Sequence, residues 1–120
     1  MNTSVKHPLV SVIIPAYNCE KYIKKTLDSV LIQNISLEII VINDCSQDET
    51  ENVILRYASE HPEIHYFKNK TNLGASGSRN RGVSLARGKY VAFLDSDDWW
   101  EPEKLKKQLA LIKRTNCVLC

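Results

Sequence analysis

The stretch Leu37–Ile42, with the sequence LEIIVI, is a short run of mostly apolar, β-branched residues. Such a run predicts a strand, and its lack of apolar and polar alternation is typical of a strand covered on both faces. Similar runs recur along the chain, at Leu9–Ile14, Ile64–Phe67 and Tyr90–Leu94, with a fifth candidate at Cys117–Cys120. We therefore expect a mostly parallel sheet that is buried between helices.

Helical patterns lie between these runs. The first carries an apolar stripe at i, i+4, i+7 and i+8 spacing, which should pack on the sheet. A second helix is expected to begin at Ser46, because Ser46 and Glu49 form a capping-box pattern. The apolar stripes of these two helices are Ile23, Leu27, Val30 and Leu31 in the first, and Val53, Ile54, Tyr57 and Ala58 in the second.

Two more helices are predicted in the second half of the chain. One spans Ala75–Ala86, between Gly74 and Gly88. The other has Pro102 in its first turn and buries a stripe formed by Leu105, Leu109 and Ile112. Regular alternation of strand and helix predicts a Rossmann-like, three-layer α/β/α fold, in which ligands bind beyond the carboxyl ends of the strands.

Length and composition are those of one domain over residues 1–120, since 120 residues with 43% hydrophobic content suit a single core. The net charge is only +2, and the basic residues are not interleaved with aromatics, so nucleic acid is not expected as a partner. No apolar run is long enough to cross a bilayer. Because the chain ends in a candidate strand, it is expected to be part of a longer domain.

The four cysteines, Cys19, Cys45, Cys117 and Cys120, predict reduced thiols in the cytoplasm, since no apolar signal segment precedes Val5. The C-x-x-C spacing at Cys117 has no second Cys or His pair that would complete a zinc site. A longer chain is still compatible with attachment to the cytoplasmic face of a membrane.

The strongest chemical signal is the sequence LDSDDWW at residues 94–100, which places Asp95, Asp97 and Asp98 directly after a strand. Three carboxylates this close repel one another unless a cation joins them. Mg²⁺ and Mn²⁺ take carboxylate oxygen and leave positions for phosphate, so a metal–diphosphate site is predicted. The alternative is that one Asp caps the next helix and the others are solvated turn residues.

Polar and aromatic residues also follow the first two strands. Asp44 ends the second strand and is expected to be free to accept from the N–H groups of a nucleobase, although a turn Asp that bonds its own backbone is as common. Tyr17 follows Pro15 at the end of the first strand and can stack on a base, while Asn18 shapes the turn. A tyrosine that only packs on its neighbours is the alternative.

Residues 72–82, with the sequence NLGASGSRNRG, combine small residues, a helix start and two arginines. Helix amino-terminal N–H groups favour anions, and Arg79 or Arg81 could bond a phosphate. These arginines are two positions apart on a helix, so only one should reach the site. The glycines form neither a dinucleotide-binding fingerprint nor a P-loop.

Four blocks, Val10–Asn18, Glu38–Ser46, Asn72–Gly82 and Asp95–Asp98, together resemble glycosyltransferase family 2. The resemblance implies a GT-A fold, with this chain as the nucleotide-sugar-binding half. It further implies that Pro15 and Tyr17 line the base pocket, Asp44 bonds the base, and Arg79 lies near the diphosphate. Within the D-x-D region the resemblance directs Asp97 toward ribose and Asp98 toward the metal. Asn43 replaces the first carboxylate of the acidic pair that usually follows the second strand, so any role of that carboxylate is missing here.

The reaction implied by the resemblance is transfer of a sugar, with inversion, from a nucleoside diphosphate, UDP by family frequency, to a hydroxyl of a glycan, lipid-linked or protein-linked acceptor. The catalytic base and the selectivity for sugar and acceptor belong to the second half of such enzymes, so this chain is expected to bind donor and metal without turnover. A noncatalytic nucleotide-binding or scaffold domain is the alternative. A sugar nucleotidyltransferase is disfavoured, because residues 16–20 lack a glycine-rich basic loop.

Overall fold

The computed structural model describes residues 7–115, and of residues 112–115 only the backbone. Its strands β1 (Val10–Ala16), β2 (Leu37–Asn43), β3 (Ile64–Lys68) and β4 (Tyr90–Phe93) form one sheet in the order β3-β2-β1-β4. All three pairings are parallel. The four strand predictions are confirmed to within two residues at each end, and the fifth candidate, Cys117–Cys120, lies outside the described residues.

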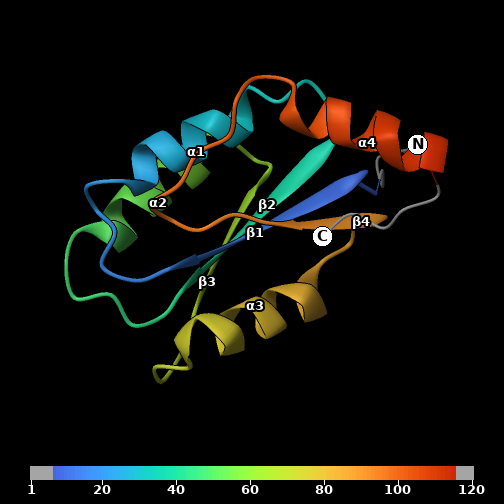
Figure 1. The fold of residues 1–120 in the computed structure, drawn as a ribbon. Coiled ribbons are helices and arrows are strands. Elements are labelled where there is room, and N and C mark those ends of the chain that lie inside the picture. Colours follow the sequence, from blue (N-terminus) through green and yellow to red (C-terminus); the bar gives the residue numbers. More distant parts are fainter. Residues whose placement is uncertain (1–6, 116–120) are drawn as a thin grey trace, which may run out of the picture.

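Helices α1 (Ile23–Leu31), α2 (Thr50–Glu60), α3 (Gly74–Leu85) and α4 (Lys104–Thr115) alternate with the strands. Figure 1 shows α1, α2 and α4 on one face of the sheet and α3 on the other. The larger core lies under the three helices, and a smaller one, centred on Ile13, Ile40 and Ile42, faces α3. This arrangement confirms the predicted three-layer α/β/α fold.

The predicted start of α2 at Ser46 is wrong, because that helix begins at Thr50. The Ser46 hydroxyl is not a helix cap: it accepts from the backbone N–H of Asn18, at 3.0 Å. Asp48 bonds the start of α2 instead, since its Oδ1 accepts from the Thr50 N–H at 2.9 Å. Although burial acts in the opposite direction, hydrogen bonds from the hydroxyl and N–H of Thr50 lower the pKa of Asp48.

Helix α4 also begins later than expected. Pro102 lies in the turn before Lys104, since Glu103 adopts φ 65°, a left-handed conformation that a right-handed helix cannot contain. Leu105 and Leu109 are buried as predicted, and the Ile112 side chain lies outside the described part.

The strand order places β1 between β2 and β4, so the chain leaves β1 toward one side of the sheet and returns on the other. Such a switch point opens a crevice at the carboxyl ends of the strands. Helix α3 packs closely against this part of the sheet, because a Cβ added at Gly82 would lie 2.4 Å from Cγ2 of Ile13. Among the described residues, no helix has the length and apolar character needed to span a membrane.

Candidate functional site

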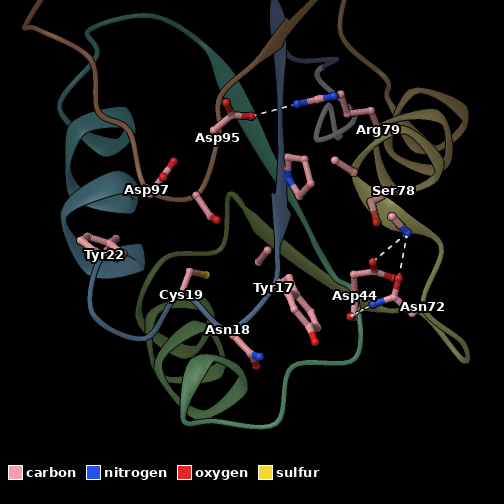
Figure 2. Close-up of a pocket in the computed structure, with 15 residues that line it drawn as sticks. Tyr17, Asn18, Cys19, Tyr22, Asp44, Asn72, Ser78, Arg79, Asp95 and Asp97 are labelled. Carbon is pink, nitrogen blue, oxygen red and sulfur yellow. Dashed lines mark hydrogen bonds and ion pairs between the residues drawn. The ribbon is translucent and has the colours of Figure 1, made fainter.

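A cleft of about 590 Å³ opens at the carboxyl ends of β1, β2 and β4. Figure 2 shows that its walls come from the β1–α1 loop, the end of β2, the start of α3 and the loop after β4. Every residue predicted to bind nucleotide lines this cleft: Pro15, Tyr17, Asn18, Asp44, Arg79 and Asp97. Residues up to 82 positions apart, from Pro15 to Asp97, are thus brought to one place, although their roles stay predictions.

Tyr17 and Asn18 form one wall with different tasks. Tyr17 is 51% exposed, and its ring faces the cleft, where it is accessible to a planar ligand. Asn18 adopts φ 45°, and its Oδ1 accepts from the Gln47 N–H at 2.8 Å. Asn18 therefore shapes the turn as predicted and also ties the loop after β1 to the loop after β2.

Asp44 is not the free carboxylate that the sequence led us to expect. It is buried, and its Oδ1 accepts from Asn69 Nδ2 at 2.9 Å and from the Leu73 N–H at 2.7 Å. Its Oδ2 accepts from the Gly74 N–H at 2.9 Å. Asp44 therefore fixes the start of α3, and the N–H groups of Leu73 and Gly74 are already used rather than open to an anion. One lone pair of Oδ2 has no donor among the described residues.

The two arginines of α3 take separate roles, as their spacing predicted. Arg79 points to the cleft, where its guanidinium donates to Asp95 Oδ1 at 3.0 Å across the opening (Figure 2). Arg81 points away and donates to the Lys68 carbonyl and to Asn69 Oδ1, at 2.9 and 2.8 Å. Arg79 uses few of its donors in this pair and is the arginine that can reach a bound phosphate.

The three carboxylates after β4 do not converge. Asp95 pairs with Arg79, and Asp98 Oδ1 accepts from the Trp99 N–H at 2.9 Å. Asp98 lines not this cleft but an adjoining pocket, which shares Arg79 and Asp95 with it. In residues 7–115, no group of three or more His, Cys, Asp or Glu side chains is placed to hold a metal ion. Asp97 is exposed, and its side chain makes no hydrogen bond or ion pair with the described residues. This geometry fits an ion that draws part of its coordination from phosphate, as Mg²⁺ commonly does, rather than a closed site made by protein alone.

Several lining residues escaped the sequence analysis. Tyr22, at the start of α1, is half exposed and forms the wall near Asp97 (Figure 2). Cys19 lies buried beside it, and burial raises the pKa of its thiol, which favours the uncharged form. Ser78 accepts from Asn69 at 3.0 Å. Asn72 and Ser78 fall within the segment singled out for phosphate, whereas the position of Tyr22, five residues after Tyr17, gave no signal.

Comparison with known proteins agrees with this architecture. The model of glycosyl transferase family 2 matches residues 11–120. TuaG of Bacillus subtilis (strain 168), named for teichuronic acid biosynthesis, is 44% identical over 111 residues, which are 92% of this chain and 44% of TuaG. The chain thus spans less than half of this relative.

Solved structures of other glycosyltransferases share the fold, and two of them hold a donor sugar nucleotide. A crystal structure of S. aureus TarS 1–349 in complex with UDP-GlcNAc has a TM-score of 0.82 and 35% identity, and the match covers 89% of this chain and 32% of the TarS 1–349 chain. The mannosyltransferase PcManGT from Pyrobaculum calidifontis, in complex with GDP-Man and Mn²⁺, has a TM-score of 0.81 and 26% identity, covering 89% and 33%. From its family match and its fold, the chain belongs to glycosyl transferase family 2.

Proposed function

We propose that this chain binds the nucleoside-diphosphate-sugar donor of a glycosyltransferase that transfers the sugar to an acceptor hydroxyl with inversion. The observation that carries the proposal is the gathering of Tyr17, Asp44, Arg79 and Asp97 in one cleft at the switch point of the sheet. A stacking ring, an acceptor, a cation and an exposed carboxylate are the groups that a base, a diphosphate and a ribose or metal require.

Uracil is the base that suits Asp44 best. Three of the four lone pairs of its carboxylate are used by Asn69, Leu73 and Gly74, which leaves one acceptor position. Uracil presents a single imide N–H, whereas guanine presents an N–H and an amino group side by side, which need two acceptors. The complex of TarS with UDP-GlcNAc supports the same choice.

A divalent ion, Mn²⁺ or Mg²⁺, would be held by Asp97 or Asp98 together with the diphosphate. Such an ion offsets the charge that develops on the departing diphosphate. Arg79 supplies a second positive charge to the same group, and the loss of its weak, exposed pair with Asp95 costs little. The presence of Mn²⁺ in the PcManGT complex supports this assignment.

Calorimetric titration of UDP and GDP, each with Mn²⁺ and then with excess chelator, tests the proposal. We expect saturable binding of UDP that weakens on chelation, and weaker binding of GDP. Tighter binding of GDP would contradict the assignment of the base. A folded chain that binds neither nucleotide would support a noncatalytic scaffold instead.

A further inference from the structure

Helix α1 and the turn after it bury three polar side chains, Thr26, Ser29 and Gln33. They lie at i, i+3 and i+7, so they share one face of the helix. That face is covered by residues 94–103, which form neither helix nor strand (Figure 1). We call residues 95–98 the Asp loop.

Each of these side chains binds the backbone of that segment in turn. Thr26 Oγ1 lies 2.8 Å from the Ser96 carbonyl and 2.6 Å from the Asp98 carbonyl. Ser29 Oγ accepts from the Trp100 N–H at 3.1 Å. Gln33 donates to the Glu101 carbonyl at 2.8 Å and accepts from the Leu105 N–H at 3.1 Å.

Residues 94–103 form no helix or strand, so these side chains supply hydrogen-bond partners that a helix or a sheet would otherwise give their backbone. A buried polar side chain without a hydrogen-bond partner is costly in free energy. Thr26, Ser29 and Gln33 therefore favour one position of the segment's backbone, the one in which all three side chains are hydrogen-bonded. Within the Asp loop, the Asp98 N–H donates to the Asp95 carbonyl at 3.0 Å. The loop is therefore a tight turn that is fastened to α1 through Thr26.

We propose that Thr26 is a positioning residue of the donor site. Its single O–H proton is donated to, or shared between, the carbonyls of Ser96 and Asp98 on the two sides of Asp97, so it sets where the Asp97 and Asp98 carboxylates meet the ligand. The same oxygen lies 3.2 Å from the carbonyl of Tyr22, one helical turn earlier in the chain, so the hydroxyl sits between the start of α1 and the Asp loop. This inference rests on the proposed function for its consequence in binding, but not for the position of the loop.

The matched variants are Thr26→Val, which removes the hydroxyl and keeps the shape, and Thr26→Ser, which keeps the hydroxyl. The only tryptophans of the sequence, Trp99 and Trp100, follow the Asp loop directly and report on it without a ligand. We expect Thr26→Val to shift their emission to longer wavelength and to increase quenching by acrylamide, with far-UV circular dichroism unchanged. Thr26→Ser should match the wild type.

The second measurement is UDP affinity, with Mn²⁺ and with chelator. Thr26→Val should lose about tenfold in UDP affinity with the ion and less without it, because the hydrogen bond from Thr26 to the backbone of the Asp loop is lost and both carboxylates are displaced. A general loss of folding would weaken both equally and would lower the urea midpoint. If Thr26→Val does not fold, Gln33→Met tests the far end of the segment by the same fluorescence shift.

Unchanged fluorescence together with unchanged affinity in Thr26→Val would overturn the inference. A wild-type chain that binds no UDP would contradict the proposed function, while the fluorescence comparison would still decide whether Thr26 holds the Asp loop.

Discussion

The two edges of the same parallel sheet each bury a carboxylate, but they use it differently. At the amino edge, Glu38 is 4% exposed and accepts from Ser11 Oγ at 2.6 Å and from the Arg87 N–H at 2.7 Å. At the carboxyl edge, Asp44 is equally buried and holds the start of α3, yet exposed Tyr17 and Asp97 remain beside it. A buried carboxylate fixes loops at either edge, and at the carboxyl edge exposed Tyr17 and Asp97 are left beside it for a ligand.

The largest effect on stability should come from removing the buried carboxylate at the amino edge. Glu38→Leu leaves the buried Ser11 hydroxyl and the Arg87 N–H without their acceptor, which should cost about 3 kcal/mol in the free energy of unfolding. Urea unfolding measures this loss. Glu38→Gln retains one acceptor oxygen and should cost less. The folded fraction of Glu38→Leu should bind UDP with unchanged affinity. A loss of affinity in the folded protein would contradict the difference between the two edges.

Asp44→Asn should combine both kinds of loss. The amide turns an N–H₂ toward one of the N–H donors of Asn69, Leu73 or Gly74, so stability should fall by about 2 kcal/mol. Because the start of α3 loosens and the acceptor for the base changes, UDP affinity should fall about tenfold or more with or without Mn²⁺. Urea unfolding and calorimetry on the same sample separate the two. Loss of stability alone would make Asp44 equivalent to Glu38.

The sequence predicted the sheet and the residues that reach its carboxyl edge, because apolar runs and the alternation of strand and helix are local patterns. It misplaced the start of α2 because the Ser46-x-x-Glu49 pattern is local, whereas Ser46 bonds Asn18, which is 28 positions away. It took Asp44 as free for the same reason, since Asn69, Leu73 and Gly74 come to it only through the fold. Tyr22 and Thr26 could not be singled out, because the loop after β4 that packs on this face of α1 lies about 70 positions away in the sequence.

The carboxylates of the Asp loop should affect binding and not stability, as their side chains are exposed. Asp98→Asn should weaken UDP binding about tenfold with Mn²⁺ and little with chelator, as the ion loses a charged oxygen ligand. Asp97→Asn should weaken binding under both conditions if Asp97 meets the ribose. Calorimetry of both variants decides this, and the urea midpoint of each should equal that of the wild type. Full affinity in both variants would contradict the site.

Tyr17 offers a smaller effect that does not depend on the ion. Tyr17→Ala should weaken UDP binding about fivefold with and without Mn²⁺, because the stacking surface is lost. Tyr17→Phe keeps the ring and serves as the matched control, with affinity near that of the wild type. Equal losses in both variants would assign the effect to the hydroxyl rather than to stacking.

The smallest effect concerns Tyr66, which lies near the carboxyl edge but does not line the cleft. Burial and a hydrogen bond from its hydroxyl to Glu51, at 2.6 Å, raise its pKa to about 12. The folded state thus favours the protonated phenol, so its contribution to stability is complete below the ordinary pKa of 10 and is lost as pH rises from 10 through 12. Tyr66→Phe should remove this part of the pH dependence.

Other groups titrate above pH 10, including Tyr57, whose pKa burial and the Asp28 carboxylate also raise to about 12. The informative quantity is therefore the difference in unfolding free energy between wild type and Tyr66→Phe, measured at pH 9 and at pH 11. That difference should shrink at the higher pH, while UDP affinity at neutral pH stays equal in the two proteins. Asn43, at the end of β2, donates to the Tyr66 hydroxyl at 2.9 Å. A change in affinity would mean that this contact influences the ligand. The residues that fix loops at the carboxyl edge would then not be separate from those that bind the ligand.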